Sequence, residues 1–157
     1  MKKMFLVFGL LIAIIIFVFV TQNGRFSNLF AFPTSHQSTI TIDNQTFSVL
    51  VAKTEKEKEI GLSSRTGLPD NMGMVFPFDT PGFYAFWMKN MKFPLDIIYI
   101  HGNKIVTIIN NLPNPTPQND TWQIVKPTEA ADLVLEINAG LSKKYNFQVS
   151  DMVKLSL

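Results

Sequence analysis

The stretch LDIIYIHGNKIVTII, residues 95–109, decides the fold class of this chain. It contains two apolar runs, Leu95–Ile100 and Lys104–Ile109, which are rich in β-branched residues and too short for buried helices. Between them stands His101-Gly102-Asn103, a triplet typical of a tight turn. The stretch therefore predicts two strands of a β-domain.

Similar apolar runs continue on both sides of this stretch and are punctuated by Pro and Gly. They are Met74–Phe78, Phe83–Met88, Leu133–Ile137 and Met152–Leu157. Nearer the N-terminus, Thr39–Ile42 and Thr46–Ala52 flank Asp43-Asn44-Gln45, which is a hairpin signal. No helical pattern of ten residues separates the runs. The sequence thus favours a compact, mainly β, single-domain sandwich or barrel-like fold over a βαβ arrangement.

One or two short helices and a long loop complete the expected domain. The segment Thr54-Glu55-Lys56-Glu57 has the capping-box pattern and predicts a helix that ends near Gly61 or Leu62. Asn138–Tyr145 is expected to form one or two helical turns. Asn111–Lys126 holds three prolines among polar residues and is expected to be a surface loop.

An apolar stretch at the N-terminus, Met4–Val20, has 17 residues without a polar or charged side chain and follows Lys2-Lys3. As a helix it would be roughly 25 Å long, slightly under the ~30 Å of a hydrocarbon core. No Ala-x-Ala-like cleavage pair follows it, so we expect an uncleaved signal anchor, with cleaved secretion as the alternative. The preceding lysines predict that the N-terminus lies in the cytoplasm.

The expected organisation has three parts. Residues 1–23 form the signal anchor, with a transmembrane helix at about 4–20. Residues 24–38 are a linker, because they mix polar residues, Pro and scattered Phe without any period. Residues 39–157 form the mainly β domain. The predicted location is the cell membrane, with a single pass and the C-terminal domain outside the cytoplasm, or secretion after signal cleavage.

Charge and cysteine content exclude several function classes. The first 20 residues hold two of the 14 Lys and Arg residues and no acid, so the remainder carries 12 charges of each sign. A nucleic-acid-binding domain would normally show a basic excess, so we expect no nucleic-acid partner. The absence of cysteine excludes disulfides, thiolate metal sites and a cysteine nucleophile. No metal-ligand spacing or cofactor motif is present, and we expect no metal and no cofactor.

Candidate ligand-binding residues are polar or aromatic and stand in turns or at the ends of apolar runs. They are Arg65, Trp87, Lys89, Asn90, Asp96, Glu136 and Asn138. Trp87 offers a flat surface, while Lys89 and Asn90 offer hydrogen-bond donors. Arg65 is suited to hold a carboxylate or phosphate through two hydrogen bonds. Glu136 is the only acid inside an otherwise apolar strand, so we expect it to meet Arg65 or a lysine.

Structural roles are the alternative for the same residues. Phe83–Met88 is apolar on both faces of a strand, which predicts a central strand with Trp87 in the core. A Lys89–Asp96 ion pair would close a hairpin without any function.

The inventory for catalysis is small. Asp96 and Glu136 offer an acid pair of the glycosidase kind, but nothing in the sequence fixes their separation. His36 falls in the linker and His101 in a turn, and no nucleophile motif accompanies them.

Several of these segments, taken together and in this order, resemble the domain of unknown function 192 family. The segments are Glu59–Arg65, Gly73–Phe76, Phe86–Asn90, Pro94–Ile100 and Leu135–Gly140. The resemblance covers about residues 39–157. It implies a compact, mostly β domain that is frequently exported or membrane-attached, and it supplies no established activity. Many members have cysteines in the loop that corresponds to Asn111–Trp122, where this chain has prolines instead.

Together these observations predict a membrane-tethered extracytoplasmic domain that binds a small or peptide-like ligand or a cell-envelope component. One alternative is a hydrolase that acts on envelope polymers through Asp96 and Glu136. A second alternative is an accessory subunit of another membrane protein, with the Phe-rich linker as the contact.

Overall fold

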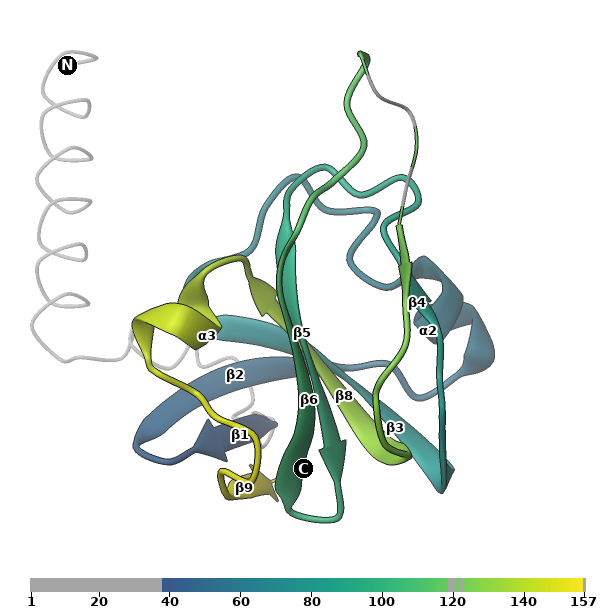
Figure 1. Cartoon of the computed structure of the whole chain (residues 1–157). Helices are drawn as coiled ribbons and strands as arrows, with labels where there is room; N and C mark the ends of the chain where they lie inside the picture. Colours follow the sequence, from purple (N-terminus) through teal and green to yellow (C-terminus); the bar gives the residue numbers. More distant parts are fainter. Residues whose placement is uncertain (1–37, 119–120, 122, 157) are drawn as a thin grey trace, which may run out of the picture. The chain divides into compact units, whose positions relative to one another are not determined.

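The computed structural model describes residues 38–118, 121 and 123–156, which form a mainly β domain with two short helices (Figure 1). The predicted anchor and nearly all of the predicted linker lie outside the described residues. Within the described part of the chain, no helix combines the length and apolarity needed to cross a bilayer.

Seven strands form one sheet in the order β6-β5-β8-β3-β2-β1-β9. Their bounds are β1 Thr39–Ile42, β2 Gln45–Val51, β3 Met72–Gly82, β5 Leu95–His101, β6 Lys104–Leu112, β8 Ala131–Asn138 and β9 Val153–Ser156. Every neighbouring pair is antiparallel except β2 and β3. Sequence and structure agree closely on these strands, which confirms the mainly β fold class.

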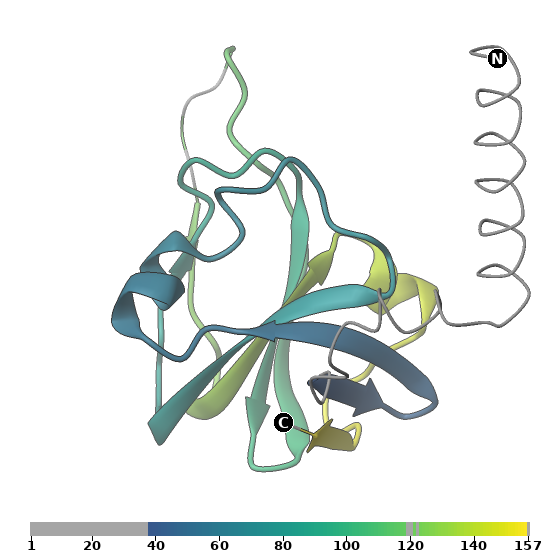
Figure 2. The same cartoon turned by 180° about the vertical axis from the view of Figure 1, so that it is seen from behind.

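The sheet curls into a half-barrel, so that its two edge strands approach each other at one end (Figure 1, Figure 2). An isolated bridge joins Lys104 at the start of β6 to Met152 beside β9. The N–H of Val153 donates to the carbonyl of Asn103 at 2.8 Å, and the N–H of Ile105 donates to Asp151 at 3.1 Å. These bonds satisfy backbone groups that an open edge would leave exposed.

The two faces of the sheet carry separate cores, because alternate side chains of a strand point to opposite faces. One face buries Ile98 and Leu135 together with residues from the other strands of the sheet and Leu141 of α3, Leu141–Lys144. The other face buries Ile97 and Val134 and is covered by segments outside the sheet, including Met88 and Met91. A strand that is buried on both faces reads as a continuous apolar run, as β5 and β8 do.

The predicted hairpin over residues 95–109 is confirmed. Strands β5 and β6 pair antiparallel on either side of Gly102 and Asn103. Gly102 has φ +59, a left-handed conformation that glycine adopts without strain.

The predicted capping box is confirmed in α2, Glu55–Ile60. The Thr54 hydroxyl accepts from the N–H of Glu57 at 3.2 Å, and the Glu57 carboxylate accepts from the N–H of Thr54 at 2.8 Å. These two hydrogen bonds satisfy backbone donors that a helix start leaves free. The helix ends before Gly61, as predicted.

One expectation about the sheet is wrong. Phe83–Met88 is not a central strand, because only β4, Phe86–Trp87, is extended there and it pairs with β7, Ile124–Val125, in a separate ribbon. Phe83 and Trp87 remain 60% and 44% exposed, while Met88 at the end of the run is fully buried in the core on this face of the sheet. The sheet also contains one βαβ unit, since β2 and β3 are parallel and connected through α2. A six-residue helix is too short to show a sustained helical period.

Candidate functional site

A cavity of about 240 Å³ lies between α2, the β3–β4 segment and β8. Five aromatic side chains are among the residues that line it, and we call it the aromatic pocket. They are Phe76, Phe78, Tyr84, Phe86 and Trp87. Strand β3 supplies the first two because residues two apart on a strand share a face, and β4 with the preceding turn supplies the others.

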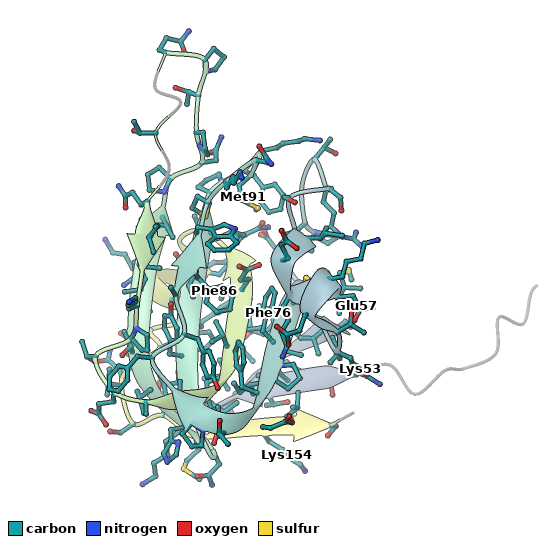
Figure 3. All side chains as sticks on the ribbon, turned by 90° about the vertical axis from the view of Figure 1, so that its right-hand side faces the viewer. Lys53, Glu57, Phe76, Phe86, Met91 and Lys154 are labelled. Carbon is teal, nitrogen blue, oxygen red and sulfur yellow. The ribbon has the colours of Figure 1, made fainter. Side chains whose placement is uncertain are left out.

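The rings hold one another in place. Phe76 and Phe86 meet edge to face with centroids 5.0 Å apart (Figure 3), and Phe86 meets Tyr99 in the same way at 5.9 Å. Phe78 and Tyr84 are stacked with centroids 3.6 Å apart, and the Tyr84 hydroxyl donates to the carbonyl of Thr80 at 2.6 Å. Such ring pairs stabilise the wall beyond the area that they bury.

The base of the aromatic pocket contains the carboxyl group of Glu136. This residue lies in the middle of β8, paired with Met74 of β3 on one side and Ile97 of β5 on the other. Its side chain is only 5% exposed, and its Oε2 atom has no hydrogen-bond partner. Burial disfavours the ionised form and raises the pKa of this carboxyl from 4.5 to about 8.

Tyr99 lies beside Glu136 on the same face of the sheet but does not serve it as a donor. Its hydroxyl donates to the carbonyl of Val125 at 3.3 Å. Burial, together with the nearby Glu136 carboxylate, raises the pKa of the Tyr99 hydroxyl. Tyr99 therefore stays protonated and ties the β4–β7 ribbon to the sheet.

The rim of the aromatic pocket carries charges of both signs. Lys58 of α2 pairs with Glu55 at 3.0 Å, and its Nζ atom also lies 4.6 Å from the centroid of the Phe78 ring. Glu59 and Lys89 complete the charged lining. One wall of the pocket thus already holds an ammonium group against an aromatic face.

Among the described residues, neither Arg65 nor a lysine forms an ion pair with Glu136, contrary to the expectation. Arg65 is exposed in the turn after α2 and is not among the residues that line the pocket. Lys58 lines the pocket, but its ammonium group pairs with Glu55. Periodicity placed Glu136 inside an apolar strand, but it carried no information on which basic side chain would approach.

Asp96 has a structural role on the opposite face of the sheet. It is fully buried, and its Oδ1 accepts from the N–H groups of Asn111 at 2.8 Å and Gly140 at 3.0 Å. Its Oδ2 accepts from the N–H of Ser142 at 2.8 Å. Strand β5 pairs Asp96 with Ile137 and the adjacent Ile97 with Glu136, so the two carboxyl groups point away from each other. They do not face one cleft, and no Lys89–Asp96 ion pair is present in the described part of the chain.

The remaining candidates divide between structure and rim. The Asn138 amide donates to the carbonyl of Leu68 at 2.7 Å and to the Asp70 carboxylate at 2.9 Å, which fixes the loop before β3. Asn90 has φ 60 and borders a shallow hollow next to the aromatic pocket, to which Trp87 and Lys89 also contribute. The structure thus brings Trp87, Lys89 and Glu136 together at one pocket, with Asn90 beside it.

Sequence reasoning missed the aromatic residues Phe76, Phe78, Tyr84 and Phe86 and the rim residue Lys58. A signal was available in the composition, because six of the twelve residues 76–87 are aromatic against 12% for the whole chain. Five of these six aromatic residues line the pocket, so the local density of aromatic residues indicates the site.

The aromatic pocket has one serine hydroxyl among its described lining residues. Ser63 lines it, but its hydroxyl donates to the carbonyl of Ile60 at 2.6 Å. No histidine occurs among the described lining residues. Among all described residues, no three His, Asp or Glu side chains converge as a metal site would need.

Fold and site define a small, mainly β domain whose curled sheet bears an aromatic pocket with a buried carboxyl group. The chain belongs to the DUF192 family, described as "Uncharacterized ACR", whose model matches residues 38–155. A search of curated proteins finds no match.

Two solved structures are similar to this chain. A protein of unknown function from Novosphingobium aromaticivorans is 31% identical, with 78% of this chain and 89% of that chain covered and a TM-score of 0.62. A protein from Sinorhizobium meliloti, whose name proposes a transcription regulator, is 27% identical, with 75% and 91% covered and a TM-score of 0.66. Both support the curled β fold, and neither assigns an activity to this chain.

Proposed function

We propose that this domain is a binding module that accepts a compact group of a small or peptide-like ligand, or of a cell-envelope component, in the aromatic pocket. The observation that carries the proposal is the Glu136 carboxyl, which is buried at the pocket base with an unpartnered oxygen. Buried polar groups are nearly always hydrogen-bonded, and an exception in a pocket indicates a missing partner.

The pocket's rim supports the same proposal. Trp87 is 44% exposed and lies at the entrance with Ile60, which is 41% exposed. Aromatic and aliphatic groups that stay partly in water at a concave site gain free energy when a ligand covers them.

The test is a thermal-unfolding screen of the full chain, kept in detergent because of residues 4–20. Compact amines, alcohols, acids, amino sugars and short peptides are compared on the wild type and on Ala85→Phe, because Ala85 lines the pocket. Thr66→Phe is the matched control, since Thr66 is exposed and outside the lining. We expect at least one compound to raise the midpoint in the wild type and the control but not in Ala85→Phe. Equal shifts in all three proteins, or no shift in any, would contradict the proposal.

For its location, we propose a domain held outside the cytoplasm by the N-terminal segment. The apolar residues 4–20 and the preceding lysines support this. Because the chain has no cysteine, Lys154→Cys provides a single label site on an exposed residue of β9. We expect a membrane-impermeant maleimide to label this variant in intact spheroplasts. Labelling only after lysis would place the domain inside the cell.

A further inference from the structure

We propose that the group recognised by the aromatic pocket is a protonated primary amine on a short alkyl stem, with its ammonium against Glu136 and its stem between the rings. This inference rests on the proposed binding function and names the class of ligand. It depends on three features of the pocket: the unsatisfied acceptor, the ring faces and the balance of charge.

The first feature is the unsatisfied Oε2 atom of Glu136, which has no hydrogen-bond donor among the described residues. Oε2 has no partner, although the neighbouring side chains do carry donors. The Tyr99 hydroxyl is bonded to Val125, and the Lys58 ammonium is bonded to Glu55. The carboxylate form of Glu136 only accepts hydrogen bonds, so a ligand that binds this form has to bring its own N–H or O–H groups. A primary ammonium brings three donors and the opposite charge, which makes the bond stronger than a neutral one.

The second feature is the wall of aromatic rings. The face of an aromatic ring carries negative partial charge and attracts cations within about 6 Å of its centroid. In this pocket Lys58 Nζ already lies 4.6 Å from the centroid of Phe78. The edge-to-face contact of Phe76 with Phe86 leaves apolar surface suited to an alkyl stem. An anionic ligand would meet the negative ring faces, and it would also meet a negative charge whenever Glu136 is ionised.

The third feature is the balance of charge around Glu136. The titratable groups that line the pocket or lie under it are Glu55, Lys58 and Glu59 from α2, Tyr84 and Lys89 from the β4 segment, Tyr99 from β5 and Glu136 from β8. With Glu136 ionised, three carboxylates face two lysines, and one negative charge is left over. A monovalent cation neutralises this surplus, and the pocket's modest volume of about 240 Å³ limits the ligand to a short chain or a terminal group.

The test uses four small probes on the full chain in detergent, followed by NMR or calorimetry. The probes are n-butylammonium, n-butanol, butyrate and tetramethylammonium. Compared with n-butylammonium, n-butanol lacks the charge, butyrate has the opposite charge, and tetramethylammonium keeps the positive charge but has no N–H donor. Glu136→Gln removes the carboxylate, and Glu129→Gln is the matched control because Glu129 is exposed and outside the pocket lining. Ala85→Phe shows whether a probe binds in the pocket.

We expect n-butylammonium to bind the wild type and Glu129→Gln at least about 10-fold more tightly than it binds Glu136→Gln, which is the usual size of a charged hydrogen bond. It should also bind more tightly than the other three probes. Because Glu136 has a pKa of about 8, only about a tenth of it is ionised at pH 7 and about nine tenths at pH 9. The affinity for n-butylammonium should therefore rise about 10-fold between these two pH values.

Three outcomes would overturn the inference. Equal or tighter binding of n-butanol or butyrate, blocked by Ala85→Phe, would mean a different ligand class while the binding function stands. Tighter binding of tetramethylammonium would mean that ring faces alone select the ligand and that the N–H donors contribute nothing. No binding of n-butylammonium at 50 mM would reject the amine outright, and the wider compound screen would then decide the binding function separately.

Discussion

Replacing Glu136 with Gln should stabilise the protein against unfolding, and the gain should grow as the pH rises. In the native protein burial holds the pKa of this carboxyl at about 8, whereas its ordinary value is 4.5. Between these two values the native state keeps a proton that the unfolded chain has released. The unfolded state thus binds fewer protons, and the free energy of unfolding falls with increasing pH.

The size of the effect follows from the shift. One pKa unit corresponds to about 1.4 kcal/mol, so the wild type loses roughly 3 kcal/mol of stability between pH 4.5 and pH 7 and roughly 4 kcal/mol by pH 9. Gln has nearly the same shape and does not ionise, so this loss is absent from the variant. A buried amide has its own cost of desolvation. This cost is the same at every pH, so it changes the stability of the variant by a constant amount and leaves the pH dependence unchanged.

The assay is urea unfolding at pH 5, 6, 7, 8 and 9, with Glu129→Gln as the control for the loss of one exposed charge. The stability difference between Glu136→Gln and the wild type should widen by several kcal/mol across this range, while the control stays parallel to the wild type. A constant difference from pH 5 to pH 9 would refute the reasoning. It would mean that Glu136 is solvated or has found a partner.

Three further changes test other parts of the structure. Asp96→Asn should cost about 3 kcal/mol in urea unfolding, because its new NH₂ group would face at least one of three N–H donors; a loss below about 1 kcal/mol would disprove this anchoring role. Thr54→Ala should cost about 1 kcal/mol and Thr54→Ser much less, measured in the same way, since Ser keeps the capping hydroxyl. Gly73→Ala should cost about 2 kcal/mol, because a Cβ there would lie 2.8 Å from Leu135 Cδ1 and 2.9 Å from the Glu136 carbonyl oxygen; an unchanged unfolding midpoint would show that β8 moves away freely.

The strands were predictable because local pattern and burial agree in them. Strand β5 is apolar at nearly every position and lies between β6 and β8 with both faces covered, as such a run indicates. The cap of α2 was predictable for a different reason. Thr54 and Glu57 satisfy each other's backbone groups within four residues, so the signal is local.

The role of the Phe83–Met88 run could not be predicted from its local pattern. Apolar residues on both faces of a strand indicate that both faces are covered. They do not indicate whether a sheet or a ligand covers them. In the structure the run forms one edge of a two-stranded ribbon, and Trp87 stays partly exposed at the pocket entrance. The long-range packing of Phe86 in β4 against Phe76 of β3 and Tyr99 of β5 decides this, and no spacing in the sequence encodes it.

The candidate site was predictable only in part for the same reason. Trp87, Lys89 and Glu136 meet at the aromatic pocket. Asp96 has equal chemistry in the sequence but points to the other face, because β5 and β8 pair in a register that the sequence does not state. Arg65 was singled out by its chemistry, yet its turn carries it away from the pocket lining.

The most direct test of the account is a pH titration of the Glu136 side-chain carboxyl by carbon NMR, with and without n-butylammonium. Without the amine, the pKa should be about 8, and with saturating amine it should fall toward the ordinary 4.5 as the ammonium favours the ionised form. A pKa near 4.5 in the free protein would contradict the buried, unpartnered carboxyl. An unchanged pKa at saturation would show that the amine does not reach it.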